Sequence, residues 1–108
     1  MVAMEQSPDM NSVLSIAQSG MQVSRLQMDT AAHNVANNLT PAFRRQTLSQ
    51  SEQAGGGVTA TVDRMPEEGQ DLAGDMVGQK MASYVFIANL RTIQTEQKMV
   101  GSLLDATA

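Results

Sequence analysis

The chain has 108 residues, with eleven acidic side chains against seven basic ones, three aromatic residues and no cysteine. This length allows one small domain and no second hydrophobic core. The net charge of −4 and the scattered basic residues argue against binding to a phosphate backbone, so we expect no nucleic-acid partner. The nine methionines supply flexible apolar volume, which suits an interface between subunits better than a rigid core.

The start of the chain lacks the pattern of a cleaved secretory signal. The first ten residues carry Glu5 and Asp9 but neither Lys nor Arg. The longest unbroken apolar stretch, Tyr84 to Ala88, is far below the ~20 residues that a membrane-spanning helix needs. We therefore expect no membrane span, and export, if it occurs, by a route that needs no cleaved signal peptide.

The first predicted element is a helix over residues 9–38, preceded by a flexible N-terminus over residues 1–8. Ser7-Pro8-Asp9 combines a hydroxyl N-cap, a proline at the first helical position and an acid in the first turn, and Asn11-Ser12 offers a start one turn later. A series spaced by three and four residues follows, apolar at six of its seven positions: Leu14, Ala17, Met21, Ser24, Met28, Ala31 and Val35. This periodicity predicts an amphipathic helix.

The predicted helix ends in a group of turn-forming residues. Asn37 and Asn38 tolerate a left-handed backbone, and Pro41 pushes Thr40 out of helical geometry. Asn34, Asn37 and Asn38 are the sharpest candidates for a functional role, because their side chains can bond backbone groups and set the direction of the following strand against a neighbouring subunit. An ordinary helix C-cap is the simpler interpretation, although it explains one asparagine better than three.

The middle segment, residues 39–70, is predicted to hold a turn, a loop and short extended pieces. Residues 46–48 and 58–62 fit short strands, and the second alternates Val and Ala with threonines. Residues 49–57 between them are polar and end in three glycines, which predicts a flexible loop with room for a small β-hairpin. Residues 64–70 form an acidic connector.

The last predicted element is a helix over residues 71–105. Taking Leu72 as the start of a 4,3 heptad series gives apolar side chains at seven of ten positions: Leu72, Met76, Phe86, Leu90, Ile93, Val100 and Leu104. Val77, Met81, Val85 and Ala88 add a second apolar face, so one partner helix cannot cover the early half of this helix. Gly74 and Gly78 either permit close approach of another helix or are two tolerated defects.

These patterns predict a mainly α fold in which the two terminal helices pair as an antiparallel, coiled-coil-like hairpin. We expect the pairing residues of the first helix to be Leu14, Met21, Met28 and Val35, facing the heptad series of the second. Ordering two helices costs nearly as much free energy as their apolar contacts return, so we expect a lone hairpin to be marginally stable. Identical or related subunits would cover the second apolar face.

The chain offers little for catalysis or metal binding. His33 is the only histidine, and it fits a capping or backbone contact near the helix end better than a nucleophilic or metal site. The acids near residues 67–75 fit a solvated connector and helix N-terminal charges, and Gly55-Gly56-Gly57 lacks the Lys-Ser/Thr of a phosphate-binding loop. We expect no enzyme activity, no metal and no cofactor.

Both ends of the chain resemble bacterial flagellar axial proteins of the rod and hook. The N-terminal motifs are Ser19-Gly20-Met21, Arg25-Leu26-Gln27-Met28-Asp29 and the stretch from Asn34 to Arg45, which is similar to the family's A-N-N-I-A-N-x-x-T-P-G-Y turn. The C-terminal motifs are Asp71-Leu72-Ala73, Met76-Val77, Phe86-Ile87-Ala88-Asn89, Ile93-Gln94-Thr95 and the stretch from Met99 to Asp105. The resemblance covers roughly residues 12–45 and 71–105, with Ala42 where the family's turn often has Gly and Phe43 where it has Tyr.

The resemblance implies a short proximal-rod-like subunit of the flagellar basal body. Such proteins polymerise through their terminal helices, contact copies of themselves and other rod or axial proteins, and pass unfolded through the flagellar type III export apparatus into the periplasmic rod. It also implies an assembly role for the turn residues Asn34, Asn37, Asn38, Thr40, Pro41 and Phe43. The alternative is a soluble helical adaptor or regulatory factor of flagellar assembly that does not enter the rod.

Overall fold

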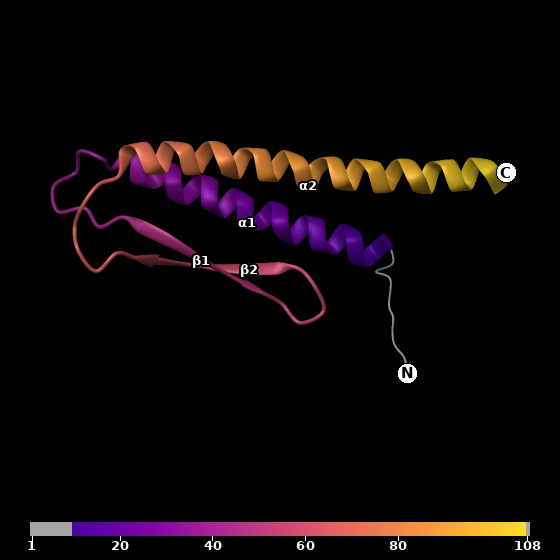
Figure 1. The fold of residues 1–108 in the computed structure, drawn as a ribbon, viewed down its shortest axis with the longest axis horizontal. Coiled ribbons are helices and arrows are strands. Elements are labelled where there is room, and N and C mark those ends of the chain that lie inside the picture. Colours follow the sequence, from indigo (N-terminus) through magenta and orange to yellow (C-terminus); the bar gives the residue numbers. More distant parts are fainter. Residues whose placement is uncertain (1–9, 108) are drawn as a thin grey trace.

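The computed structural model describes residues 10–107, which form α1 (Met10–Ala36), β1 (Gln46–Glu52), β2 (Val58–Arg64) and α2 (Leu72–Thr107). Two long helices and a small antiparallel sheet make up the fold, as Figure 1 shows, and this confirms the predicted mainly helical class with a hairpin between the helices along the chain. The helix bounds lie within two residues of the predicted ones. The predicted flexible segment 1–8 and the N-cap expected at Ser7 lie outside the described residues.

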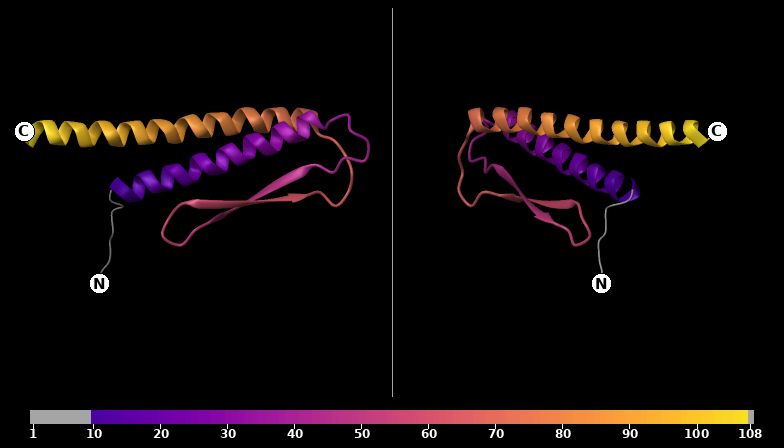
Figure 2. Two further views of the ribbon diagram at one scale, coloured as in Figure 1. Left: turned by 180° about the vertical axis from the view of Figure 1, so that it is seen from behind. Right: turned by 45° about the vertical axis from the view of Figure 1, so that its right-hand side comes forward.

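The helices and the hairpin lie side by side in one layer. α1 occupies the middle, with α2 along one side and the hairpin along the other, in all three ribbon views (Figures 1 and 2). The molecule measures 63 × 33 × 14 Å. Its shortest dimension is less than half of the next, so the molecule is flat, whereas domains are normally built from two packed layers. The radius of gyration, 18.4 Å, accordingly exceeds the value of about 13 Å for a compact domain of this length.

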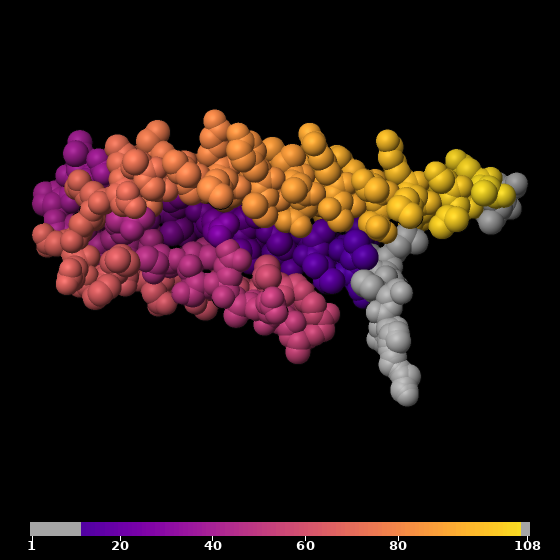
Figure 3. All heavy atoms as spheres, in the orientation of Figure 1, coloured from indigo at the N-terminus to yellow at the C-terminus, as the bar shows by residue number. Residues whose placement is uncertain are grey.

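α1 and α2 pair in antiparallel orientation. Asn34, near the end of α1, hydrogen-bonds Asp75 in the first turns of α2, and Gly20 faces Asn89 further along. The helices lie closest together near the end of α1 and diverge toward its start, and α2 continues past that start (Figures 1 and 2). On the face shown in Figure 3, α1 is visible along a strip between α2 and the hairpin.

The interior is small and partly polar. Within the described part of the chain, the buried apolar side chains are those of Ala17, Val23, Ala31 and Ala82. The buried polar ones are Ser24, Thr30, Asn34 and Asp75. Small residues let α1 and α2 approach closely: a Cβ on Gly20 would lie 2.8 Å from the Nδ2 of Asn89. The fold is therefore held by close helix contact and buried hydrogen bonds more than by large apolar side chains.

The hairpin is longer than the sequence pattern predicted, and the predicted loop over residues 49–57 is correspondingly shorter. β1 pairs with β2 from Gln46 opposite Arg64 to Glu52 opposite Val58, so strand pairing includes the polar residues 49–52. The turn needs its glycines, because Gly55, Gly56 and Gly57 all have positive φ. Gly57 also lies against α1, where the hydroxyl of Ser19 accepts a hydrogen bond from the Val58 N–H (3.1 Å).

Candidate functional site

A buried polar junction joins the three elements at one end of the molecule. It consists of Asn34 of α1, Arg45 and Gln46 at the start of β1, and Asp75 of α2. The Asn34 side chain is 4% exposed. Its Nδ2 donates to the Gln46 carbonyl (2.9 Å), and its Oδ1 accepts from the Gln46 N–H (2.8 Å), so it replaces a strand partner for that residue. Asn34 thus sets the direction of β1 within its own chain, whereas we had expected it to act against a neighbouring subunit.

An ion pair forms the second half of the polar junction. The Arg45 guanidinium binds Asp75 through both Nε and Nη2, with Nε 3.0 Å from Oδ2, and Asn34 Nδ2 approaches Oδ1 at 3.4 Å. The hydrogen bond to Asp75 raises the pKa of Arg45, and burial opposes this shift to a smaller extent. Since a raised pKa in the folded state favours the charged form, the guanidinium stays protonated and the stabilisation persists throughout the neutral pH range.

The turn after α1 is closed by local hydrogen bonds. The Asn37 Nδ2 donates to the His33 carbonyl (2.9 Å), and its Oδ1 accepts from the Thr40 hydroxyl (3.1 Å). The residue with positive φ is Ala42 (φ 58°), so the expected left-handed backbone at Asn37 and Asn38 is wrong. Pro41 and Phe43 follow the same turn, and the Phe43 ring packs against His33 with centroids 5.5 Å apart.

The predicted pairing residues of α1 all lie on its covered sides. Leu14, Met21, Met28 and Val35 are half-buried, and the positions between them in the series, Ala17, Ser24 and Ala31, are buried. Ser24 is the most enclosed residue of the group, at 1% exposed. Because the most enclosed residue is a serine, α1 is packed here through small side chains that allow close contact, and not through large apolar ones.

The covered side of α2 differs from the predicted heptad series by one residue at every second position. Phe86, Ile93 and Val100 are half-buried, as the series requires, but Leu72, Met76, Leu90 and Leu104 are exposed. Asp75 and Asn89, which directly precede Met76 and Leu90, lie on the covered side in their place, and Ala82 and Glu96, one residue before the series positions Ser83 and Gln97, are covered as well. These side chains are small or polar, so a pattern search for apolar residues selects their larger neighbours instead.

The outer side of α2 is consequently rich in exposed apolar residues. Among residues 12–106, eleven of the large exposed apolar side chains are on α2: Leu72, Met76, Val77, Met81, Tyr84, Val85, Ile87, Leu90, Met99, Leu103 and Leu104. In its first half, Val77, Met81 and Tyr84 are each more than half exposed (58%, 61% and 59%). Apolar surface concentrated on one helix in this way makes α2 a candidate interaction surface.

An open groove lies beside the polar junction. It has a volume of about 460 Å³ and is lined by Ala31 and Asn34 of α1, by residues 45–48 of β1, and by residues of α2 that include Gly74, Gly78, Met81 and Val85. A Cβ added to Gly78 would meet no atom within 4 Å, so the fold of the single chain does not require glycine there. The open space beside Gly78 favours the interpretation that this part of α2 allows another helix to approach closely.

Sequence reasoning missed the partners of the polar junction. Arg45 was noted only as the last residue of the turn motif, and Asp75 was interpreted as a favourable charge near the helix start, a role that the N-cap residue Asp71 fills by accepting from the Gly74 N–H (3.1 Å). No periodic signal in the sequence marked Asp75, because the covered side of α2 is known only from the structure; once its burial is seen, a buried acid requires a cationic partner.

Within the described residues there is no group of three or more His, Cys, Asp or Glu side chains that could hold a metal ion. In the same part of the chain, neither helix is long and apolar enough to cross a bilayer. No protein-family model matches the chain, and no curated protein matches it.

Proposed function

We propose that the protein is a structural subunit of the bacterial flagellar basal-body rod, which polymerises through its terminal helices. The observation that carries this proposal is the single-layer architecture: α2 pairs with α1 through one side and leaves Val77, Met81 and Tyr84 largely exposed on the other. A layer 14 Å thick lacks the second layer that normally encloses a domain core. In a tubular polymer, neighbouring subunits would supply that layer.

The turn supports the same proposal. Its sequence from Asn34 to Phe43 resembles the axial-protein turn, in which glycine is frequent at the position of Ala42. Ala42 adopts a φ of 58°, a conformation that glycine reaches without strain. The resemblance and the positive φ therefore both point to position 42 as the place where this turn favours glycine.

The remaining parts of the proposal follow from the resemblance. The partners are copies of this chain and other rod or axial proteins, the route is the flagellar type III export apparatus, and the location is the periplasmic rod. In this role the chain binds no nucleic acid and catalyses no reaction. We propose that α1 and α2 adopt their full coiled-coil-like packing in the assembled rod, where neighbours press the diverging ends together.

The test compares assembly with folding. The purified chain should unfold with low cooperativity and gain helicity when it assembles with itself or with rod proteins, and its gene deletion should leave basal bodies incomplete. The pair Val77→Ser/Met81→Ser should abolish assembly while the helix content of the monomer stays, because both side chains are solvent-exposed in the single chain. Val62→Ser, on the hairpin, is the matched control and should assemble normally.

A discrete monomer or dimer that melts sharply, never polymerises and stays in the cytosol would contradict the rod proposal. That result would instead favour the soluble adaptor, which keeps the terminal helices without entering the rod.

A further inference from the structure

We infer that two copies of the chain pair through β2, strand against antiparallel strand, and so join their hairpins into one four-stranded sheet. The contact uses the backbone N–H and C=O groups of Ala60, Val62 and Arg64 that point away from β1, which together we call the open edge. It involves no part of α2, so it is independent of the proposed rod function.

The hydrogen bonds of the hairpin leave one edge of each strand without a strand partner. The Met65 N–H donates to the Arg45 carbonyl (2.7 Å), and the Gln53 N–H donates to the Gly57 carbonyl (3.0 Å). Opposed residues in an antiparallel pair alternate between bonded and non-bonded, so the odd-numbered residues between these points bond across the hairpin. The even-numbered residues of both strands therefore direct their backbone groups outward.

α1 covers a different strand edge at each end of the hairpin. At the base, Asn34 bonds both outward groups of Gln46 on β1. At the tip, the hydroxyl of Ser19 accepts from the outward N–H of Val58 on β2. The edge of β2 is therefore uncovered toward the base, across the hairpin from the position that Asn34 covers, and none of the described residues hydrogen-bonds the open edge.

The residue types along the open edge favour another β-strand as its occupant. β2 alternates valine and alanine with threonine up to Val62, whereas the uncovered half of β1 carries Gln50 and Glu52, which suit strands less well. Within residues 12–106, the exposed large apolar side chains in or beside the hairpin are Val62 and Met65 (37% and 39%). Unpaired strand edges are usually protected by proline, by lysine or by a bulge, and β2 has none of these.

β2 matches a second copy of itself in one register. When Val62 lies opposite Val62 of the second copy, Ala60 lies opposite Arg64 and Arg64 opposite Ala60. All three residues of the open edge then meet residues whose backbone groups also point outward, which gives a continuous ladder of hydrogen bonds. On the side of the sheet that faces the helices, the central side-chain pair is two valines.

The neighbouring registers use the open edge less completely. Moving the centre of the contact one residue toward the tip brings in Val58, whose N–H already bonds Ser19. Moving it one residue toward the base brings in Pro66, which has no N–H to donate. The register centred on Val62 is therefore the one that the available backbone groups select.

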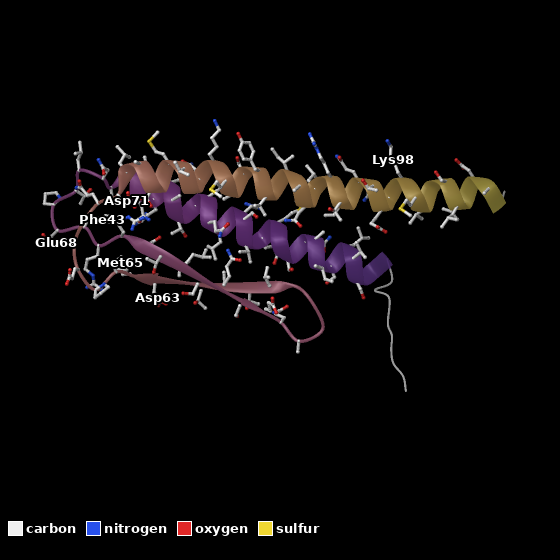
Figure 4. All side chains as sticks on the ribbon, viewed as in Figure 1. Phe43, Asp63, Met65, Glu68, Asp71 and Lys98 are labelled. Carbon is white, nitrogen blue, oxygen red and sulfur yellow. The ribbon has the colours of Figure 1, made fainter. Side chains whose placement is uncertain are left out.

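The charges of β2 are compatible with this register. Its two charged residues are Asp63 and Arg64. Asp63 lies opposite Thr61 of the second copy, a hydroxyl that can donate to the carboxylate, and the two Asp63 side chains are only diagonal neighbours, roughly 7–8 Å apart. Figure 4 shows Asp63 at the margin of the hairpin away from the helices, where its side chain is exposed. No like charges therefore lie directly opposite each other.

Such a contact is isologous, because both copies contribute the same surface, and it closes at two copies. The paired hairpins form a sheet in the order β1-β2-β2-β1. A two-stranded hairpin is at best marginally stable, whereas three or more strands with a covered side are stable, so pairing also strengthens the part of the fold that has the fewest contacts with α2.

A proline substitution tests the open edge without disturbing the hairpin. Val62→Pro removes an outward N–H and no hydrogen bond between β1 and β2, and Gln50→Pro is the matched control, with the same change on the outward edge of β1. All chains also carry Val77→Ser/Met81→Ser, which excludes polymerisation through α2. Sedimentation should show a dimer for the parent and for Gln50→Pro, and dimerisation weakened about tenfold or more for Val62→Pro. Far-UV circular dichroism should not distinguish the two proline variants, and Val62→Ser, which keeps both backbone groups, should still dimerise.

A single cysteine tests the register in the same background, since the chain has no native cysteine. Val62→Cys places two thiols opposite each other, with Cα atoms about 5.5 Å apart, which is within the range for a disulfide. Mild oxidation should give a covalent dimer and nothing larger. Arg64→Cys is the control: the two copies of residue 64 would lie four positions apart along the strands, roughly 13 Å, so it should give no dimer.

The outcomes separate this inference from the rod proposal. A monomeric parent, equal dimerisation of the two proline variants, or a disulfide that forms as readily at residue 64 as at residue 62 would overturn the pairing and leave the rod function standing. A wild-type chain that pairs through Val62 but never polymerises would overturn the rod function and leave the pairing intact.

Discussion

Replacing Asp75 by Asn should destabilise the protein far more than its position near a helix start suggests. The substitution keeps the shape of the side chain but removes the charge that binds Arg45 through two nitrogens. Hydrogen bonds to charged groups contribute about 1.5–3 kcal/mol each. The Arg45 side chain is 21% exposed and regains some hydration when the pair is lost, so we expect a net loss of about 2–3 kcal/mol, below the 3–5 kcal/mol typical of a fully buried pair.

Urea unfolding followed by far-UV circular dichroism measures this loss. With a slope of about 1–2 kcal/mol per molar urea for a small domain, the midpoint should fall by roughly 1–2 M. Asp105→Asn is the matched control: it removes the same charge from an exposed position on the same helix, and its midpoint should not change. In a double-mutant cycle with Arg45→Met, Asp75→Asn should cost much less when the arginine is already absent. Equal midpoints for the Asp75 and Asp105 variants would refute the assignment of the polar junction as the main link between the elements.

Three further substitutions test other contacts by the same unfolding measurement. Ala42→Gly should stabilise the protein by about 0.5–1 kcal/mol, because relief of the positive φ exceeds the entropy that glycine adds to the unfolded chain; a loss of stability would contradict this. Gly20→Ala should destabilise it by about 1 kcal/mol, since the new methyl meets Asn89, and an increase in stability would show that the helices have room to separate. Asn34→Ala should cost about 2–3 kcal/mol and speed amide hydrogen exchange at Gln46, whereas unchanged exchange there would mean that another group satisfies this backbone.

The periodic parts of the fold could be predicted from the sequence. The three-and-four spacing from Leu14 to Val35 located α1 and its covered sides, and the valine-rich stretch near residue 60 located β2. These signals work because one side of each element is buried consistently and the residues that fill it are apolar.

The rest could not be predicted because burial here does not follow hydrophobicity. At Asp75 and Asn89 the covered side of α2 carries polar groups, and the apolar residues beside them are exposed, so four of the ten positions of the heptad series lie one residue after a covered one. The polar residues 49–52 pair with β2, but their side chains are all exposed, so no apolar alternation marks them as a strand. The left-handed residue was Ala42, although asparagine favours that conformation more.

The single layer has a consequence for how this chain tolerates sequence change. α1 is enclosed on two opposite sides by α2 and the hairpin, so polar substitutions at its buried positions, such as Ala17, Val23 and Ala31, should impair folding itself. Within residues 12–106, Val77 and Tyr84 on the outer side of α2 are both more than half exposed, so a library of variants at such positions should pass a screen for expression and solubility almost intact. For the rod function proposed above, the same library scored by swimming should show strong selection at those positions, and the difference between the two scores should outline the surface that serves assembly.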